Sequence, residues 1–238
     1  LQGAAGILYL VDIGLTIFST DLSMPVPELA REAEARGFNS LYLPEHTHIP
    51  ASRLTPPPTG EEQLPQEYKR TLDPFVVLGA AAAVTEKIRL GTAGCLLAQR
   101  DPVVTAKAAA TLDLVSGGRL VFGIGFGWNK EEMATHGVDF RHRRALVREK
   151  MLAVERLWTE EEAAFEGEMV KLEPSWSWPK PIQSPRPPVL IGGAAGPKMF
   201  AHIAEYADGW MPIGGAGVAE ALPKLHAAMA AAGRDPGR

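Results

Sequence analysis

Short apolar runs alternate along the chain with longer amphipathic or alanine-rich segments. The apolar runs predict six core strands, at 13–18, 40–44, 88–94, 120–124, 189–193 and 208–213. The segments between them predict helices, at 25–36, 74–85, 102–115, 143–158, 197–206 and 219–232. A strand followed by a helix, repeated roughly every 30 to 50 residues, is typical of right-handed βαβ units around a parallel sheet.

Two of the predicted helices begin with the same dipeptide. Asp73 precedes Pro74, and Asp101 precedes Pro102. An aspartate favours the N-cap position, and proline fits the first helical position because its missing N–H has no partner there in any case. These pairs therefore predict where both helices begin.

Two segments interrupt the repeat. Residues 50–70 are rich in proline and glutamate and bury little, which predicts an insertion loop or lid at the surface. Residues 163–188 combine an alternating pattern, typical of a small hairpin, with a proline-rich connector over 174–188. Since neither segment separates two cores, we expect residues 1–238 to form a single domain.

The βαβ repeat leaves two architectures open, a doubly wound sheet and a (β/α)8 barrel. In both, ligands bind at the carboxyl ends of the strands. The residues expected there include glycines, two histidines and a tryptophan, but no close pair of carboxylates, no Ser/His/Asp set and no metal-ligand set. The residues at this edge of the sheet therefore favour a reaction that uses a flat cofactor over a hydrolytic reaction.

The stretch 117–128 reads as a tight turn, a buried strand and a glycine-rich loop. Gly123, Gly125 and Gly127 alternate, so they share one face of an extended chain. That bare face can receive either a flat ligand or another backbone, and a Gly-x-Gly pattern alone does not decide between them.

The amino-acid composition further limits the class of protein to which the chain can belong. The 238 residues are 46% hydrophobic and 22% charged, with a net charge of −4, which is typical of a soluble globular protein with no broad attraction for nucleic acid or acidic membrane. Cys95 is the one cysteine, so a reducing, cytoplasmic compartment fits. The apolar stretch 1–13 lacks a basic region and contains Asp12, so it predicts neither a signal peptide nor a membrane span.

Several motifs in fixed order resemble one known family. They are Gly-Thr-Ala-Gly at 91–94, Arg-Asp-Pro-Val-Val-Thr-Ala-Lys at 100–107, Thr-Leu-Asp-Leu-Val-Ser-Gly-Gly-Arg at 111–119, Gly-Ile-Gly-Phe-Gly-Trp at 123–128, Pro-Lys-Pro-Ile-Gln at 179–183 and Ala-Asp-Gly-Trp at 207–210. Together they resemble the bacterial luciferase-like superfamily, and most closely its actinobacterial oxidoreductases that use coenzyme F-420. The resemblance implies a (β/α)8 TIM barrel whose last two strands are absent from this chain, and hence a longer native protein.

The resemblance also implies a cofactor site. It places His46 at the face of the isoalloxazine ring as the catalytic residue, and a non-prolyl cis peptide at Ala93–Gly94 behind that ring. It assigns the cofactor phosphate to Arg144, within the basic run 141–144. The remaining cofactor-binding residues are expected in the glycine-rich loops, at Gly125, Gly127, Gly192, Gly193, Ala194 and Ala195. The last four precede a helix, where backbone N–H groups alone can bind phosphate.

Other residues are assigned with the same resemblance in view. Sugar-phosphate dehydrogenases of the F-420 branch carry an acidic glutamate near the position of Trp128, so that substrate is not expected here. Trp128 and Tyr68 are expected to line the substrate pocket. Cys95 and His48 are expected to be structural.

The implied activity is hydride transfer between coenzyme F-420 and a small organic substrate. One alternative is an FMN-dependent monooxygenase that receives reduced cofactor from a separate reductase. A second alternative is a barrel that binds cofactor without turnover. Since the family's barrels commonly pair through helices, a homodimer is expected.

Overall fold

Six parallel strands form one sheet. The structure, a computed structural model, describes residues 11–57, 60 and 63–235. The strands, in the order in which they pair, are β1 (Gly14–Thr16), β2 (Ser40–Leu43), β3 (Arg89–Thr92), β4 (Leu120–Gly125), β7 (Val189–Gly193) and β8 (Gly209–Pro212). Each coincides with a predicted strand. Most of the apolar stretch 1–13 and four positions of the 50–70 insertion, 58–59 and 61–62, lie outside the described residues.

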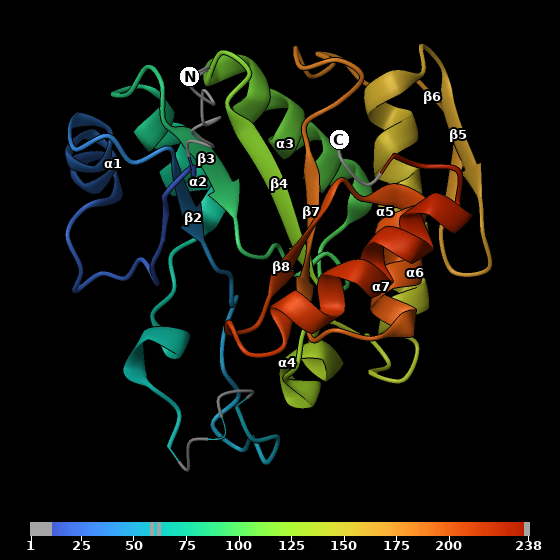
Figure 1. The fold of residues 1–238 in the computed structure, drawn as a ribbon, viewed down its shortest axis with the longest axis horizontal. Coiled ribbons are helices and arrows are strands. Elements are labelled where there is room, and N and C mark those ends of the chain that lie inside the picture. The colour runs from blue at the N-terminus through green and yellow to red at the C-terminus, as the bar shows by residue number, and fades with distance from the viewer. Residues whose placement is uncertain (1–10, 58–59, 61–62, 236–238) are drawn as a thin grey trace, which may run out of the picture.

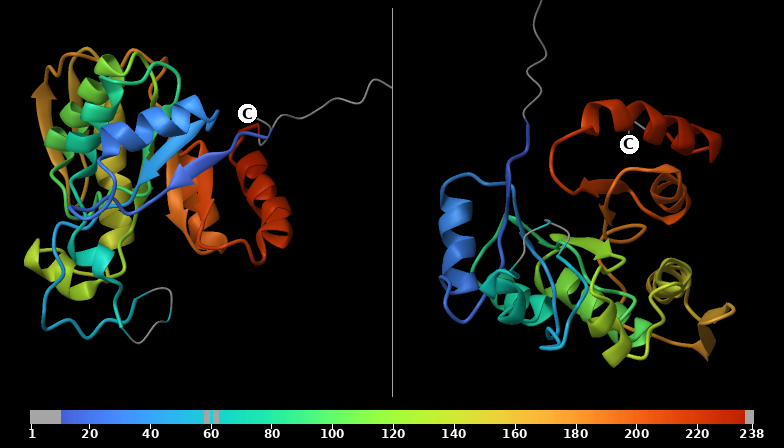
Figure 2. Two further views of the ribbon diagram at one scale, coloured as in Figure 1. Left: turned by 90° about the vertical axis from the view of Figure 1, so that its left-hand side faces the viewer. Right: turned by 90° about the horizontal axis from the view of Figure 1, so that it is seen from below.

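Helices cover the outer side of the curved sheet (Figures 1 and 2). They are α1 (Val26–Ala35), α2 (Pro74–Ala82), α3 (Pro102–Val115), α5 (Arg143–Thr159), α6 (Pro197–Tyr206) and α7 (Val218–Ala231). All six were predicted from the sequence. The sheet and these helices correspond to six of the eight strand–helix units of a (β/α)8 barrel. The fold prediction is therefore confirmed.

Four further elements of the described chain lie outside the βαβ repeat. Strands β5 (Ala163–Glu166) and β6 (Lys171–Ser175) pair antiparallel, which confirms the hairpin of the second insertion. Within the 50–70 insertion, Gln66–Lys69 forms a short 3-10 helix, η1. Helix α4 (Lys130–Thr135) follows β4 and was not predicted, because six residues are too few to show a helical period of apolar positions.

The predicted helix caps are present. The Asp73 side chain accepts the Val76 N–H at 3.1 Å, and the Asp101 side chain accepts the Val104 N–H at 2.9 Å. Each cap satisfies one of the N–H groups that the first turn of a helix leaves without a partner. Because these helices begin just beyond the carboxyl ends of the strands, the caps also fix where the neighbouring loops turn.

Asp113 fastens the second insertion to the core. Its fully buried carboxylate accepts the backbone N–H groups of Ile182 at 2.8 Å and Gln183 at 3.0 Å, and the Gln183 side-chain amide at 2.6 Å. The same amide donates to the Leu120 carbonyl at the start of β4. The proline-rich connector is therefore held beside β4 by hydrogen bonds to one side chain.

We predict that Asp113→Asn lowers the free energy of unfolding by about 1–3 kcal/mol, because an amide cannot accept all three donors and leaves one buried N–H without a partner. Urea denaturation measures the loss. Glu28→Gln on the exposed face of α1 is the control and should change stability by less than about 0.5 kcal/mol. Equal stabilities of the two variants would contradict the role given to Asp113.

Candidate functional site

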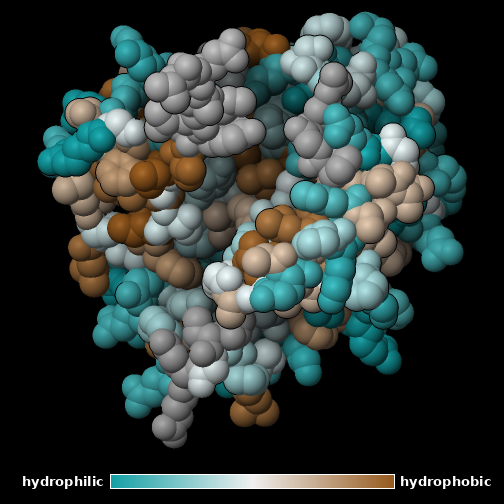
Figure 3. Space-filling model, viewed as in Figure 1, coloured by the Kyte–Doolittle hydropathy of each residue, from teal (hydrophilic) through white to brown (hydrophobic). Residues whose placement is uncertain are grey.

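A cavity of about 670 Å³ lies at the carboxyl ends of the strands. This volume is in the range of small-molecule sites, roughly 300–1,000 Å³. In Figure 1 these strand ends point toward the lower side of the molecule, where α4 lies. The space-filling view in Figure 3, taken from the same direction as Figure 1, shows polar and apolar side chains mixed around a hollow near the middle of the face toward the viewer.

Most of the predicted site residues line this one cavity. They are His46, Tyr68, Ala93, Gly94, Gly125, Gly127, Trp128, Arg144, Gly192 and Gly193. Ala194 and Ala195 are exposed and do not join the lining, because they lie beyond the end of β7 where the chain leaves the sheet for α6. The phosphate role predicted for the backbone N–H groups of these two alanines, just before α6, stays a prediction.

The three alternating glycines of β4 and the following loop differ in what surrounds the position of a Cβ atom. A Cβ on Gly123 would overlap the Thr92 carbonyl oxygen, so this position is bare to admit the neighbouring backbone. Gly127 has φ +75°, and a Cβ there would overlap Met133. A Cβ on Gly125 would meet nothing nearer than Leu96 at 3.9 Å. Of the three, Gly125 is the glycine that leaves open space in the cavity.

The peptide between Ala93 and Gly94 is cis, as the resemblance implied. A Cβ on Gly94 would lie 2.7 Å from the carbonyl carbon of Ile124, so this loop packs directly on the backbone of β4. The next residue, Cys95, donates its N–H to the Gly123 carbonyl at 2.7 Å. Its thiol is fully buried, and burial raises its pKa, which fits the structural role predicted for it.

Glu45 holds the same loop from the other side. Its buried carboxylate accepts the Leu96 N–H at 2.7 Å and the Nε–H of Arg100 at 2.6 Å. Arg100 also pairs with Asp73, the cap of α2. The residue before His46 therefore anchors the loop that carries the cis peptide, a link that the sequence did not reveal.

His46 lies under a cluster of aromatic rings and is 8% exposed. The ring of Tyr68, from η1, has its centroid 5.2 Å from that of His46, and the Trp128 ring lies at 5.6 Å. The Trp128 indole N–H donates to His46 Nε2 at 3.3 Å. Phe18 extends the cluster by contacting Tyr68 at 4.6 Å. Both predicted substrate-pocket residues thus contact the predicted catalytic histidine.

Glu132 is the site residue that sequence reasoning missed. It is fully buried in the first turn of α4, and its Oε2 lies 2.7 Å from His46 Nδ1. The available signal was Asn129, whose side chain caps α4 by accepting the N–H groups of Glu131 and Glu132. An asparagine followed three residues later by a glutamate is a helix-start pattern that could have located both α4 and its carboxylate.

Two arginines at the start of α5 supply positive charge to the cavity. Arg143 Nε and Arg144 Nη1 are buried and have no hydrogen-bond partner within the described part of the chain. Burial, together with the charge of Arg144, lowers the pKa of Arg143. Arg141, by contrast, is largely exposed and pairs with Asp139. The cavity end of the basic run is thus built to attract an anion.

His202 lies near Arg144, with the ring of Phe126 between them. Its ring stacks on Phe126 at 5.0 Å, and Phe126 in turn lies under the guanidinium of Arg144 at 4.7 Å. Burial and the charge of Arg144 lower the pKa of His202. The neutral form of the His202 ring is thus favoured, and Arg144 carries the positive charge beside Phe126.

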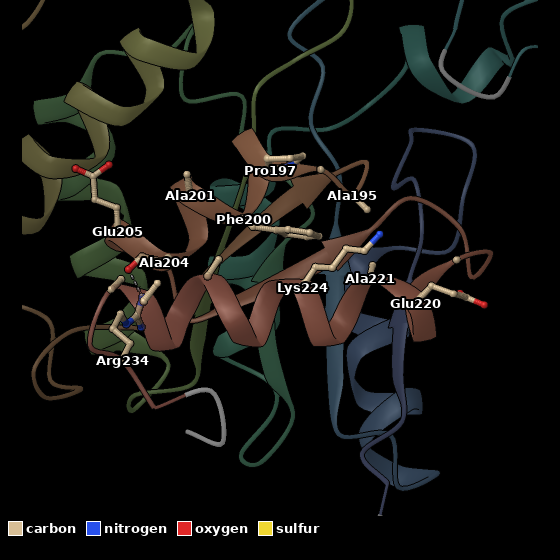
Figure 4. Close-up of a pocket in the computed structure, with 15 residues that line it drawn as sticks. Ala195, Pro197, Phe200, Ala201, Ala204, Glu205, Glu220, Ala221, Lys224 and Arg234 are labelled. Carbon is tan, nitrogen blue, oxygen red and sulfur yellow. Dashed lines mark hydrogen bonds between the residues drawn. The ribbon is translucent and has the colours of Figure 1, made fainter.

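A larger groove of about 1,040 Å³ runs between α6 and α7 (Figure 4). Pro197, Phe200 and Ala221 contribute apolar surface to it. Of its charged side chains, Glu205 pairs with Arg148 on α5, and Arg234 donates to backbone carbonyls at the end of α6. The groove lies on the helical outer layer and includes no histidine, so it does not share the chemistry of the central cavity.

Two searches of the described residues were negative. No group of three or more His, Cys, Asp or Glu side chains among them could hold a metal ion. None of the helices in the same part of the chain is long and apolar enough to cross a membrane.

Comparisons with known sequences find a family and close relatives. The family model for luciferase-like monooxygenases matches residues 24–238. An uncharacterized protein of Mycobacterium tuberculosis is 49% identical over 225 residues, which cover 93% of this chain and 79% of that protein. The phthiodiolone/phenolphthiodiolone dimycocerosates ketoreductase of Mycobacterium kansasii is 30% identical over 217 residues, which cover 86% of this chain and 58% of the ketoreductase.

Solved structures of similar fold include enzymes of several kinds. Monooxygenase RslO1 from Streptomyces bottropensis superposes with a TM-score of 0.79 at 28% identity, over 95% of this chain and 68% of its own. An F-420-dependent secondary alcohol dehydrogenase, in complex with an F-420–acetone adduct, gives 0.76 at 23%, over 95% and 66%. A type II Baeyer–Villiger monooxygenase from Pseudomonas putida, in complex with FMN, gives 0.73 at 20%, over 94% and 64%. The last two likenesses show the fold alone.

We predict opposite outcomes for alanine at Gly123 and Gly125. Gly123→Ala should lower the free energy of unfolding by about 1–3 kcal/mol or more, because the new methyl group overlaps the backbone of β3. Gly125→Ala should change it by less than about 1 kcal/mol, because its methyl group enters the cavity. Denaturant melts of both variants measure the difference. A Gly125→Ala protein as unstable as Gly123→Ala would show that the space beside Gly125 is not open.

Proposed function

The chain belongs to the luciferase-like monooxygenase family, and on this premise we propose that its central cavity binds a deazaflavin or flavin ring for an oxidation–reduction reaction, with coenzyme F-420 as the cofactor. One observation supports this most strongly. A single cavity has both the histidine under the aromatic rings, His46, and the partly unpaired arginine, Arg144, in its lining. A flat ring with an anionic tail needs both kinds of surface.

The residues present fit such a cofactor. Gly125 leaves open space on β4, and the cis peptide Ala93–Gly94 adds a surface without bulky side chains to the same cavity. Arg143 Nε and Arg144 Nη1 are buried and lack a hydrogen-bond partner among the described residues. A bound anion would accept hydrogen bonds from them and offset the free-energy cost of burying donors without partners. When bound, the deazaflavin ring would supply the chemistry of hydride transfer, in which two electrons move together.

The chain's own residues supply binding, shielding and proton handling. His46 is the group that takes or gives a proton at the reacting face, since an imidazole changes charge near neutral pH more readily than any other side chain. Tyr68 and Trp128 cover it and restrict the access of water. The aromatic surfaces favour an uncharged organic substrate at this end of the cavity.

The choice of coenzyme F-420 is supported by the order of sequence motifs, since the fold is shared both with the F-420-dependent alcohol dehydrogenase and with the FMN-bound Baeyer–Villiger monooxygenase. An FMN-dependent monooxygenase, served by a separate reductase, is the second candidate. It is favoured by the similarity to RslO1 and by the two adjacent arginines, whose paired charge suits a dianionic phosphate monoester. A barrel that binds cofactor without turnover is the third reading.

Substrate and assembly are part of the proposal. The ketoreductase relative and the alcohol dehydrogenase of similar fold make alcohols and ketones the first small molecules to screen.

We also propose a homodimer, supported by the apolar side chains that the outer faces of α2 and α3 expose, at Val76, Val104 and Val115.

We predict that the protein binds coenzyme F-420 and that Arg144→Ala weakens this binding by roughly 10- to 100-fold, the usual worth of a hydrogen bond to a charged group. Arg141→Ala, in the exposed part of the same basic run, is the matched control and should leave the affinity within about twofold. Calorimetric titration with F-420 and with FMN measures both variants. Tight FMN binding without F-420 binding would favour the monooxygenase, and binding of neither would contradict the cofactor site.

We predict that His46→Ala lowers turnover roughly 10²- to 10⁴-fold while cofactor affinity stays nearly unchanged, because the histidine moves a proton but holds no anionic group. Turnover is followed through the absorbance of the cofactor with an alcohol or ketone found by screening. Turnover equal to that of the wild-type protein would remove His46 from the mechanism.

A further inference from the structure

The carboxylate of Glu132 is buried against the histidine of the proposed site with both oxygens engaged. Oε2 lies 2.7 Å from His46 Nδ1, and Oε1 accepts the Thr47 N–H at 3.1 Å. The Glu132 side chain is 1% exposed and that of His46 is 6% exposed. The cap on α4 fixes the backbone from which this carboxylate projects, since the Asn129 side chain accepts the Glu132 N–H at 3.2 Å.

We propose that Glu132 is a positioning residue that fixes the tautomer of His46 with the proton on Nδ1. An ionised carboxylate only accepts hydrogen bonds, so the ring nitrogen that faces it must donate. Nε2 is then left with a lone pair directed away from Glu132.

A second contact, from another part of the chain, requires the same tautomer. Trp128 Nε1–H is a donor only, and it lies 3.3 Å from His46 Nε2, which must therefore accept. An acceptor on one side of the ring and a donor on the other leave a single neutral form that satisfies both. Trp128 thus occupies the position on Nε2 that a substrate hydroxyl would take.

The consequence for catalysis rests on the function proposed above. In alcohol oxidation, the substrate hydroxyl would replace the Trp128 N–H at Nε2, and its proton would pass to Nε2 as the O–H bond breaks. The hydride on the hydroxyl-bearing carbon would go to the two-electron acceptor that oxidised coenzyme F-420 supplies when bound. The alcohol becomes a carbonyl compound, and the imidazole becomes an imidazolium. The Glu132 carboxylate stabilises that imidazolium by accepting the hydrogen bond from Nδ1–H. Ketone reduction runs the same steps in reverse.

Ring nitrogen spectroscopy of the whole protein tests the tautomer directly. The long-range ¹H–¹⁵N spectrum is recorded over a pH series, and the tautomer is read from the spectra in which the ring nitrogens show the neutral form. The wild-type protein should show His46 protonated on Nδ1, and the His46→Ala variant assigns the signal. A wild-type signal for the Nε2–H form would overturn the proposal.

Glu132→Gln should lose this preference, because an amide can donate to Nδ1 as readily as it accepts from it. Glu131→Gln is the matched control from the same helical turn. Glu131 accepts the Leu54 and Thr55 N–H groups instead of contacting His46, so this change should leave the tautomer as it is. A Glu132→Gln protein in which His46 stays fully protonated on Nδ1 would overturn the assignment.

A further variant keeps the proposal testable if Glu132→Gln does not fold. Trp128→Phe removes the donor to Nε2 and leaves Glu132 in place, so His46 should remain protonated on Nδ1. A change to the Nε2–H form in this variant would show that Trp128, not Glu132, sets the tautomer.

Kinetics separates positioning from a purely structural role. Glu132→Gln should lower kcat roughly 10²- to 10⁴-fold with the dissociation constant of coenzyme F-420 unchanged. An unaltered kcat would overturn the role of Glu132 in catalysis. If the wild-type protein bound no cofactor, the proposed function would fail, whereas the ring spectrum would still decide whether Glu132 sets the tautomer.

Discussion

The site depends on a close approach of two backbones, where the loop after β3 lies flat on β4. Gly123 admits the Thr92 carbonyl oxygen, and Gly94 packs on the peptide between Ile124 and Gly125. Hydrogen bonds close the contact, since the Cys95 N–H donates to Gly123 and the Gly125 N–H donates to Cys95 at 2.9 Å. Without side chains between them, these segments form a bare surface at the ends of the strands.

The chemistry is assembled at that surface by residues on either side of it. His46 lies in the loop after β2, and the chain that leaves β4 passes through Trp128 into α4, which places Glu132 behind the histidine. A short capped helix directly after β4 therefore links the glycine-rich wall to the proton-handling group. Arg144, at the start of α5, brings the positive charge from the next element along the chain.

The sequence predicted the βαβ framework well, because strand and helix signals there depend on local patterns. Apolar runs located the six core strands, and amphipathic or alanine-rich segments located the six long helices, two of which begin at Asp-Pro caps. Family resemblance placed His46 and the cis peptide after Ala93 in one site. Helix α4 was missed because it has only six residues, and Glu132 was missed with it, since its pairing with His46 spans 86 positions of sequence.

The glycines show a structural difference that a sequence pattern alone does not predict. Spacing alone gave Gly123, Gly125 and Gly127 the same status, yet the first admits a backbone, the second faces open space and the third adopts a positive φ. Ala194 and Ala195 were grouped with Gly193 because all of them precede a helix N-terminus, and the structure leaves the two alanines outside the cavity lining. Such differences depend on what approaches each residue from elsewhere in the fold.

A crystal structure of the protein with coenzyme F-420 tests the central claim most directly. The account predicts electron density for the tricyclic ring between the Ala93–Gly94 peptide and His46, with the anionic tail at Arg144. Density for the cofactor in the groove between α6 and α7, with an empty central cavity, would contradict it.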